Sequence, residues 1–429
     1  WALLDSLPLS QLQDSGDADL NGWLALARAA KSNGTPEQQQ AAIDAWRQQN
    51  PQHPAAQNLP EQLNQLKQLA NQPLSKIALL LPQDGPLAAV AQALRDGFMA
   101  SYYQAQQNGQ TAPTVELYDS NKITSLDDFY RQAQAAGVQL VVGPLEKPLV
   151  KQLNDRSQLP ITTLALNYSE GSKPGPAQLF QFGLAAEDEA RSVARRAWDD
   201  GMRRAVALVP RGEWGDRVLA AFRQSWEADG GTLIAAEHVD QPVQLAQQIA
   251  DLFQLRQSEG RAKSLQSTVG GNIAAQPSRR QDIDFIFLAS TPQQAQQIKP
   301  TLNFQYAGDV PVYATSNLYS ASGDVNQYND MNGIRFCETP WLLSTSDPLR
   351  QQVAAQWPQA NSSLGRLYAM GVDADRLAPR LGQLKALPNS TIEGQSGNLS
   401  MSPTQRVQRQ LPWAQFVSGQ VQRLPDTPR

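Results

Sequence analysis

The chain has 429 residues and a mass of 47.0 kDa, with 41% hydrophobic and 18% charged residues. Such a composition is typical of a globular protein, and at roughly 150 residues per domain the length predicts about three domains or lobes. The formal net charge of −4 argues against general nucleic-acid binding, which needs clustered Lys and Arg. The apolar runs are far shorter than the roughly 20 residues that cross a bilayer.

Cysteine and histidine are scarce, which excludes several kinds of site. Cys337 is the single cysteine, so neither an internal disulfide nor a cysteine zinc site can form. His53 and His238 are the two histidines and do not form an HExxH motif. We therefore expect no metal and no cofactor. Because the chain begins with Trp1 and shows no signal-peptide core, we interpret it as a fragment or mature segment.

Residues 1–72 are expected to be helical, because Gln and Ala are abundant and β-branched residues are rare. Trp23 and Leu26 fall on one helical face, and Ile43 and Trp46 fall on another. This order resembles one tetratricopeptide unit, at the end of a truncated repeat region. A single unit cannot bury its own face, so we expect further repeats before it. An unrelated helical hairpin is the alternative interpretation.

From residue 76 to about 316 short apolar runs alternate with amphipathic segments of helical length. The runs lie at 77–81, 115–118, 140–142, 161–166, 180–184, 205–209, 233–239, 283–288 and 310–314. This alternation predicts an α/β fold built from right-handed βαβ units around parallel sheets. About four strands precede residue 167 and four follow residue 203, which predicts two Rossmann-like lobes.

The pattern becomes irregular at two places. Residues 257–282 are expected to form an insertion with a loop. Beyond residue 316 we expect a strand at 332–338, helices at 349–357 and 363–387, and hairpins at 392–401 and 413–424. The predicted domains are therefore a helical segment, 1–72, and an α/β domain, 73–429. Lobe 1 would take about 76–180 with part of 320–390, and lobe 2 about 181–315 with part of 330–424.

Several motifs resemble known families. The segments IALLLP (77–82), LRDGF (94–98) and VVGP (141–144) are similar to the first lobe of type I periplasmic-binding proteins. More specific motifs resemble the LpoA family of outer-membrane lipoproteins, which activate penicillin-binding proteins. These are RRQDIDFIF (279–287), QQAQQIKP (293–300), YAGDVPVYATS (306–316), RLYAMG (366–371), GNLS (397–400) and LPW (411–413).

The resemblance implies a non-enzymatic periplasmic protein, tethered to the inner leaflet of the outer membrane. The lipid-bearing cysteine of the family is not in this chain. The implied partner is a class A penicillin-binding protein, a bifunctional peptidoglycan synthase, with peptidoglycan as a further partner. An activator must bind the active state of its target better than the resting state. Two other functions stay open: a small-molecule receptor or sensor, and a glycan-acting hydrolase.

Candidate ligand contacts follow the predicted strands, because ligands of open α/β sheets bind beyond the carboxyl ends of strands. Polar side chains and backbone amides there could hold a ligand, and aromatic rings could stack on its apolar part. Ordinary turn and hinge residues are the alternative. The cleft candidates are Asp84, Leu145, Asn167, Tyr168, Trp214, Asn317 and Tyr319.

Other candidate sites carry weaker signals. Residues 81–86 lack the glycine spacing of a phosphate-binding loop, which disfavours a nucleotide-dependent enzyme. Carboxylate pairs that could cleave glycans have a structural alternative, since most are expected in first helical turns or on solvated faces. They are Asp127 and Asp128, Asp199 and Asp200, Glu187 to Glu189, and Asp373 and Asp375.

A small basic patch is the partner-binding candidate. Arg279 and Arg280 lie in the predicted insertion, and Arg261 and Lys263 precede them in the sequence. Guanidinium groups there could meet an acidic partner surface through charge-assisted hydrogen bonds. The alternative is a solvated loop beside an edge strand.

Overall fold

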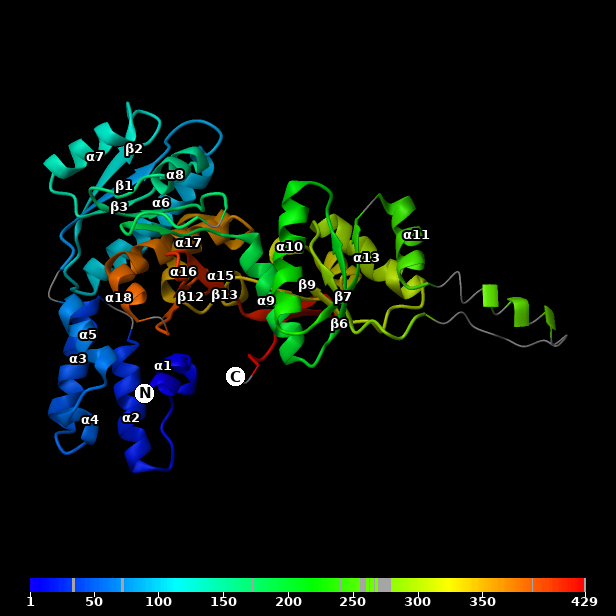
Figure 1. Ribbon diagram of the computed structural model, residues 1–429, viewed down its shortest axis with the longest axis horizontal. Helices are drawn as coiled ribbons and strands as arrows, with labels where there is room; N and C mark the ends of the chain where they lie inside the picture. Colours follow the sequence, from blue (N-terminus) through cyan, green and yellow to red (C-terminus); the bar gives the residue numbers. More distant parts are fainter. Residues whose placement is uncertain are drawn as a thin grey trace. The chain divides into compact units, whose positions relative to one another are not determined.

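The structure, a computed structural model, describes residues 1–32, 35–70, 73–171, 173–239, 241–254, 260–261, 263–265, 267–268, 279–387 and 389–427 (Figure 1). It divides into two compact units. Unit 1 comprises Trp1–Leu184, Thr345–Ala360 and Leu364–Arg409, and unit 2 comprises Ala185–Ser344, Asn361–Ser363 and Gln410–Arg429. Among the described helices, none combines the length and the apolar character that a membrane-spanning helix requires.

Unit 1 begins with helices, as predicted. They are α1 (Ala2–Ser6), α2 (Ala18–Ala30), α3 (Pro36–Gln49), α4 (Pro54–Gln57) and α5 (Glu61–Ala70). Helix α3 starts where it does because Thr35 forms a capping box with Gln38. Leu26 and Ile43 are fully buried and pack with Trp46 in the core of this segment.

The parallel sheet of unit 1 has the order β2-β1-β3-β4-β5. Its strands are β1 (Lys76–Leu81), β2 (Thr114–Asp119), β3 (Leu140–Val142), β4 (Thr162–Ala165) and β5 (Leu179–Gln181). Ile77 and Leu79 face α6 (Ala88–Gln107), whereas Ala78 and Leu80 face α7 (Leu126–Ala135) and α8 (Lys147–Asn154). Strands β1, β3, β4 and β5 are buried on both faces, which explains their continuous apolar runs, whereas the edge strand β2 is partly exposed.

A later part of the chain completes unit 1. It contains α16 (Pro348–Gln356), α17 (Gly365–Leu377), α18 (Leu381–Ala386) and a small sheet of β11 (Ile392–Glu393), β12 (Asn398–Met401) and β13 (Val407–Gln410). Helices α6 and α17 cross closely through Gly97 and Gly371. The predicted single helix at 363–387 is wrong in one respect. It is interrupted by a 3-10 turn, Ala378–Arg380, because Pro379 has no N–H to continue the helical hydrogen bonds.

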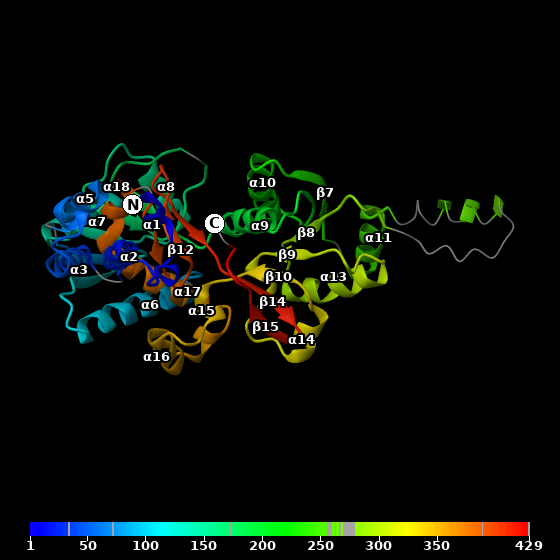
Figure 2. The same ribbon diagram turned by 90° about the horizontal axis from the view of Figure 1, so that it is seen from below.

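Unit 2 contains a seven-stranded sheet of order β15-β14-β10-β9-β8-β6-β7. Its parallel strands are β6 (Arg204–Val209), β7 (Thr232–His238), β8 (Phe285–Leu288), β9 (Val312–Ala314) and β10 (Arg335–Cys337). The hairpin of β14 (Trp413–Val417) and β15 (Gln420–Arg423) adds to β10 in the antiparallel sense (Figure 2). This confirms the hairpin predicted at 413–424.

Helices accompany this sheet in the described part of unit 2, and α15 (Pro340–Leu343) is a short one that follows β10. The longer ones are α9 (Ala186–Asp199), α10 (Glu213–Ala228), α11 (Pro242–Leu252), α13 (Pro292–Phe304) and α14 (Val325–Asp330). Phe222 and Trp226 of α10 pack with Phe285 and Phe287 of β8 in the core. Most of the insertion expected at 257–282 lies outside the described residues.

Candidate functional site

The loops after β1 and β2 are joined by side chains at the carboxyl edge of the sheet of unit 1. Asp84, a cleft candidate, is exposed after β1, and its carbonyl accepts a hydrogen bond from Asn121 Nδ2 at 2.8 Å. Asp119, the last residue of β2, accepts the N–H groups of Gln83 (3.2 Å) and Asn121 (3.0 Å) on Oδ1. The loop after β1 is therefore fixed to the end of β2.

Three cleft candidates lie together in unit 1. Asn167 Nδ2 donates to the carbonyl of Leu145 at 2.9 Å, and Asn167 Oδ1 accepts the N–H of Tyr168 at 2.9 Å. Leu145 itself is 6% exposed and belongs to the core under α6. These bonds hold the loops after β3 and β4 side by side. A ligand contact at these residues stays a prediction.

Tyr168 is held by a segment that comes much later in the chain. Its hydroxyl donates to the carbonyl of Val407 at 2.5 Å, and the carbonyl of Gly183 lies 3.3 Å from the same oxygen. The guanidinium of Arg406 lies 5.8 Å from the Tyr168 ring centre and donates to the carbonyl of Ser169 at 2.9 Å. Sequence analysis missed Arg406, because more than two hundred residues separate it from its partners and no local pattern marks it.

The cleft candidates of unit 2 occupy different environments. Trp214 lies in the first turn of α10 and is partly buried against the core. Asn317 is exposed in a 3-10 turn, Ser316–Leu318, that follows β9. Tyr319 is 8% exposed, and its ring packs 5.1 Å from Phe336 and 6.0 Å from Tyr328. Packing thus accounts for the position of Tyr319, and its role as a ligand contact stays a prediction.

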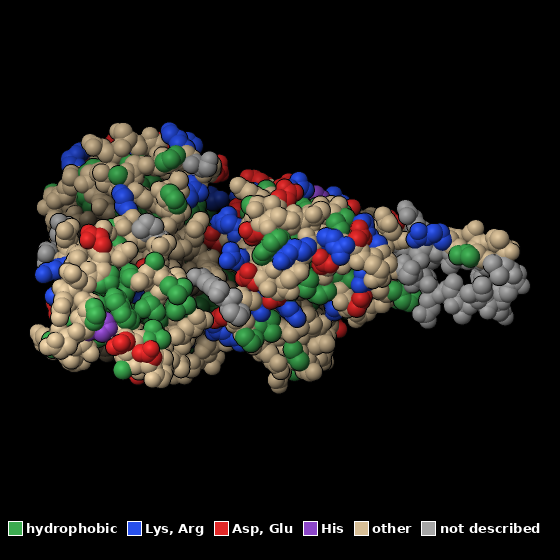
Figure 3. All heavy atoms as spheres, turned by 60° about the horizontal axis from the view of Figure 1, so that its bottom comes forward, with side chains coloured by type: hydrophobic (Ala, Val, Ile, Leu, Met, Phe, Trp, Pro, Cys, Tyr) green, Lys and Arg blue, Asp and Glu red, His purple; other side chains and the backbone are tan. Residues whose placement is uncertain are grey.

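The arginines of the expected basic patch form local ion pairs. Arg279 binds Asp309 through two nitrogens at 3.1 and 2.6 Å, and Arg280 binds both oxygens of Asp282. The hydrogen bond from each arginine lowers the pKa of the carboxyl group that it meets. Their side chains are only 11% and 22% exposed. Figure 3 shows basic and acidic side chains interspersed over the visible face of unit 2.

Asp373 and Asp375 are not on a solvated face, which corrects the expectation for this pair. Asp373 is fully buried and accepts the N–H groups of Gln395 and Ser396, both at 2.7 Å, together with the Ser396 hydroxyl. Burial raises the pKa of Asp373, and it raises the pKa of Asp375 to about 6. Asp373 therefore anchors the loop that joins β11 and β12.

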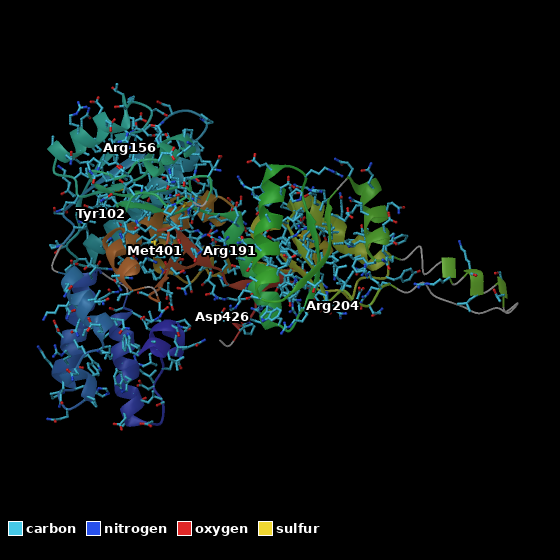
Figure 4. All side chains as sticks on the ribbon, viewed as in Figure 1. Tyr102, Arg156, Arg191, Arg204, Met401 and Asp426 are labelled. Carbon is cyan, nitrogen blue, oxygen red and sulfur yellow. The ribbon has the colours of Figure 1, made fainter. Side chains whose placement is uncertain are left out.

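Other carboxylates of the expected pairs also have structural partners. Arg156, which is labelled in Figure 4, donates to Asp127 at 2.6 Å. Asp200 accepts the hydroxyl of Tyr313 at 2.6 Å and the guanidinium of Arg196 at 3.2 Å. Within the described part of the chain, no group of three or more His, Cys, Asp or Glu side chains is placed to hold a metal ion.

Comparisons with known proteins agree with the two-unit architecture. The model of the LppC lipoprotein family matches residues 1–419. The penicillin-binding protein activator LpoA of Yersinia pseudotuberculosis is 31% identical over 485 residues, covering 98% of this chain and 72% of that protein. Full-length LpoA of Haemophilus influenzae has a TM-score of 0.70 at 27% identity, covering 99% of this chain and 73% of that one.

Two further solved structures match most of the chain. The LpoA C-domain of Haemophilus influenzae, described as a regulator of PBP1A, has a TM-score of 0.67 at 26% identity, covering 82% of this chain and all of that one. A branched-chain amino acid ABC transporter protein of Chromobacterium violaceum has a TM-score of 0.60 at 27% identity, with coverages of 80% and 99%. The predicted type I periplasmic-binding-protein-like fold is thereby confirmed.

Proposed function

The chain belongs to the LppC lipoprotein family, and from this membership we propose that it binds and activates a class A penicillin-binding protein, a bifunctional peptidoglycan synthase. The proposal rests on the family match over residues 1–419, whose relatives are named penicillin-binding protein activators. We further propose that the protein works in the periplasm and is tethered to the inner leaflet of the outer membrane by lipid. Peptidoglycan is a proposed second contact.

The proposed activation is non-enzymatic. A regulator raises the rate of its target by binding the active state more tightly than the resting state. A tenfold stimulation requires a difference of about 1.4 kcal/mol between the two binding free energies. The structural partners of Asp127, Asp200 and Asp373 support this proposal, because these carboxylates hold helices and loops together.

We propose that the helical segment 1–72 and the α/β domain 73–429 are separate domains that meet where α5 packs against α18 and through polar bonds. Arg380 donates to the carbonyl of Ser32 at 2.8 Å, and the N–H of Leu9 donates to Glu393 at 2.7 Å. These contacts lie within unit 1 and support a defined junction between the two domains. Limited proteolysis that releases an intact 73–429 fragment would agree with this division.

The test of function is reconstitution with a purified class A synthase. Glycan polymerisation and peptide cross-linking are measured on a fluorescent lipid-linked substrate, with and without the chain. We expect the chain to raise at least one of the two rates and to sediment with the synthase. The heat-denatured chain is the control. If both synthase rates stay unchanged at a saturating concentration of the chain, activation is refuted. Peptidoglycan turnover by the chain without any synthase would favour the hydrolase alternative.

A further inference from the structure

Two segments that lead from unit 1 to unit 2 lie side by side next to β5. The chain leaves unit 1 after Leu184, shortly beyond β5, and again after Arg409, within β13. The N–H of Gln181 donates to the carbonyl of Gln405 at 3.0 Å, and Gln181 forms a parallel bridge with Arg406. The two segments therefore run in the same direction as they leave unit 1. We call residues 182–184 and 407–409 the crossing segments.

Tyr168, from the loop after β4, contacts both crossing segments through its hydroxyl group. The hydroxyl oxygen lies 2.5 Å from the carbonyl oxygen of Val407 and 3.3 Å from that of Gly183. A phenol has one proton, so the nearer carbonyl accepts it and the other carbonyl is an alternative acceptor. Val407 and Gly183 are both buried. Because a buried carbonyl without a donor is costly, this hydroxyl stabilises the arrangement in which the two segments stay close.

The ring of Tyr168 is held in place by close contacts on these same segments. A Cβ atom on Gly183 would lie 3.0 Å from Cε2 of the ring, which is shorter than an ordinary carbon contact. The guanidinium of Arg406 lies 5.8 Å from the ring centre. Its Nη2 donates to the carbonyls of Ser169 at 2.9 Å and Gly171 at 2.7 Å. The loop after β4 is therefore fixed to the second crossing segment, and the ring packs directly on the backbone of the first.

We propose that Tyr168 is a hinge latch, whose hydroxyl links the two crossing segments and thereby restricts the motion of unit 2 relative to unit 1. Motion between two compact units takes place in the few residues that connect them. Two connecting segments that are linked to each other have fewer independent backbone rotations than two separate ones. The contacts of the latch all lie within unit 1. The proposal thus depends neither on a ligand nor on synthase activation.

The first test is amide hydrogen exchange in the variant Tyr168→Phe, which keeps the ring and removes the hydroxyl. Exchange in the crossing segments should be roughly fivefold faster, the factor that corresponds to one ordinary hydrogen bond. Exchange in β1 and β3 should stay unchanged. Tyr130→Phe is the matched control, because its hydroxyl oxygen lies 2.5 Å from Thr163 Oγ1 elsewhere in the same unit. This control should leave exchange in the crossing segments unchanged.

The second test measures the distribution of distances between the two units by electron paramagnetic resonance. Spin labels are attached to Lys122→Cys in unit 1 and Phe304→Cys in unit 2, since each native side chain is 77% exposed. Cys337 is buried and stays unlabelled. Tyr168→Phe should broaden the distribution, whereas Tyr130→Phe should not. Gly183→Ala should act like Tyr168→Phe, because the added Cβ pushes the ring away from its place.

The two measurements together separate a latch from a residue that only stabilises unit 1. If Tyr168→Phe changes neither local exchange nor the width of the distance distribution, the latch is refuted. Faster exchange throughout unit 1 would refute it as well, since the hydroxyl would then stabilise the whole unit. Faster local exchange with an unchanged distance distribution would also overturn the proposal, because the crossing segments would then not control the motion.

Discussion

The crossing of α6 and α17 in unit 1 gives a sharp prediction for the substitution Gly97→Ala. A Cβ atom on Gly97 would lie 2.2 Å from the carbonyl oxygen of Tyr368. A normal contact of these atoms is more than 1 Å longer. Because the obstructing atom belongs to the backbone, the two helices must separate, and the core residues Leu94 and Phe98 must separate from α17 with them.

The magnitude follows from two opposing contributions. Overpacking costs about 1–3 kcal/mol in well-packed cores. The cost at Gly97 should lie at the upper end of this range, because a backbone atom cannot move aside as a flexible side chain can. The higher helix propensity of Ala recovers about 1 kcal/mol. We therefore expect Gly97→Ala to lower the free energy of unfolding of unit 1 by about 2 kcal/mol. For a unit of this size the melting temperature should fall by roughly 4–8 °C.

The assay is thermal unfolding followed by circular dichroism, with Gly16→Ala as the matched control. A Cβ on Gly16 meets nothing within 4 Å, so this variant should melt close to the native chain. Gly371→Ala should behave like Gly97→Ala, because its Cβ would lie 2.2 Å from the carbonyl oxygen of Leu94. If Gly97→Ala and Gly16→Ala melt at the same temperature, the close crossing of α6 and α17 is wrong.

Three further predictions concern polar groups. Burial raises the pKa of Asp375 to about 6. The protonated carboxyl therefore stabilises the fold fully below pH 3.8, and this contribution is lost as the pH rises through 6. In the variant Asp375→Asn, the free energy of unfolding measured with urea should depend less on pH between 3.8 and 6. Arg406→Met should speed amide hydrogen exchange at 167–169, because the bond to the Ser169 carbonyl is lost; unchanged exchange would contradict this role. Arg279→Asp should lower the melting temperature, and adding Asp309→Arg should restore it by re-forming the ion pair with reversed charges. If this double variant is stable but binds the synthase more weakly, the result would support docking of the synthase at Arg279.

Local sequence patterns determined the elements and several of their ends. The apolar run at 77–81 became β1, Lys76–Leu81, and the run at 205–209 became β6, Arg204–Val209. Ser125 caps α7, and Thr291 forms a capping box with Gln294 at the start of α13. These features are readable because strand alternation, helix periodicity and caps involve residues only a few positions apart.

The tertiary structure alone decided which of these elements and side chains meet. Gly97 meets the backbone of Tyr368 and Gly371 meets the backbone of Leu94 where α6 and α17 cross. Arg406 packs on Tyr168, and Asp373 binds Ser396. No local pattern encodes such contacts, because their energy depends on shape and burial between segments that the folded chain brings together.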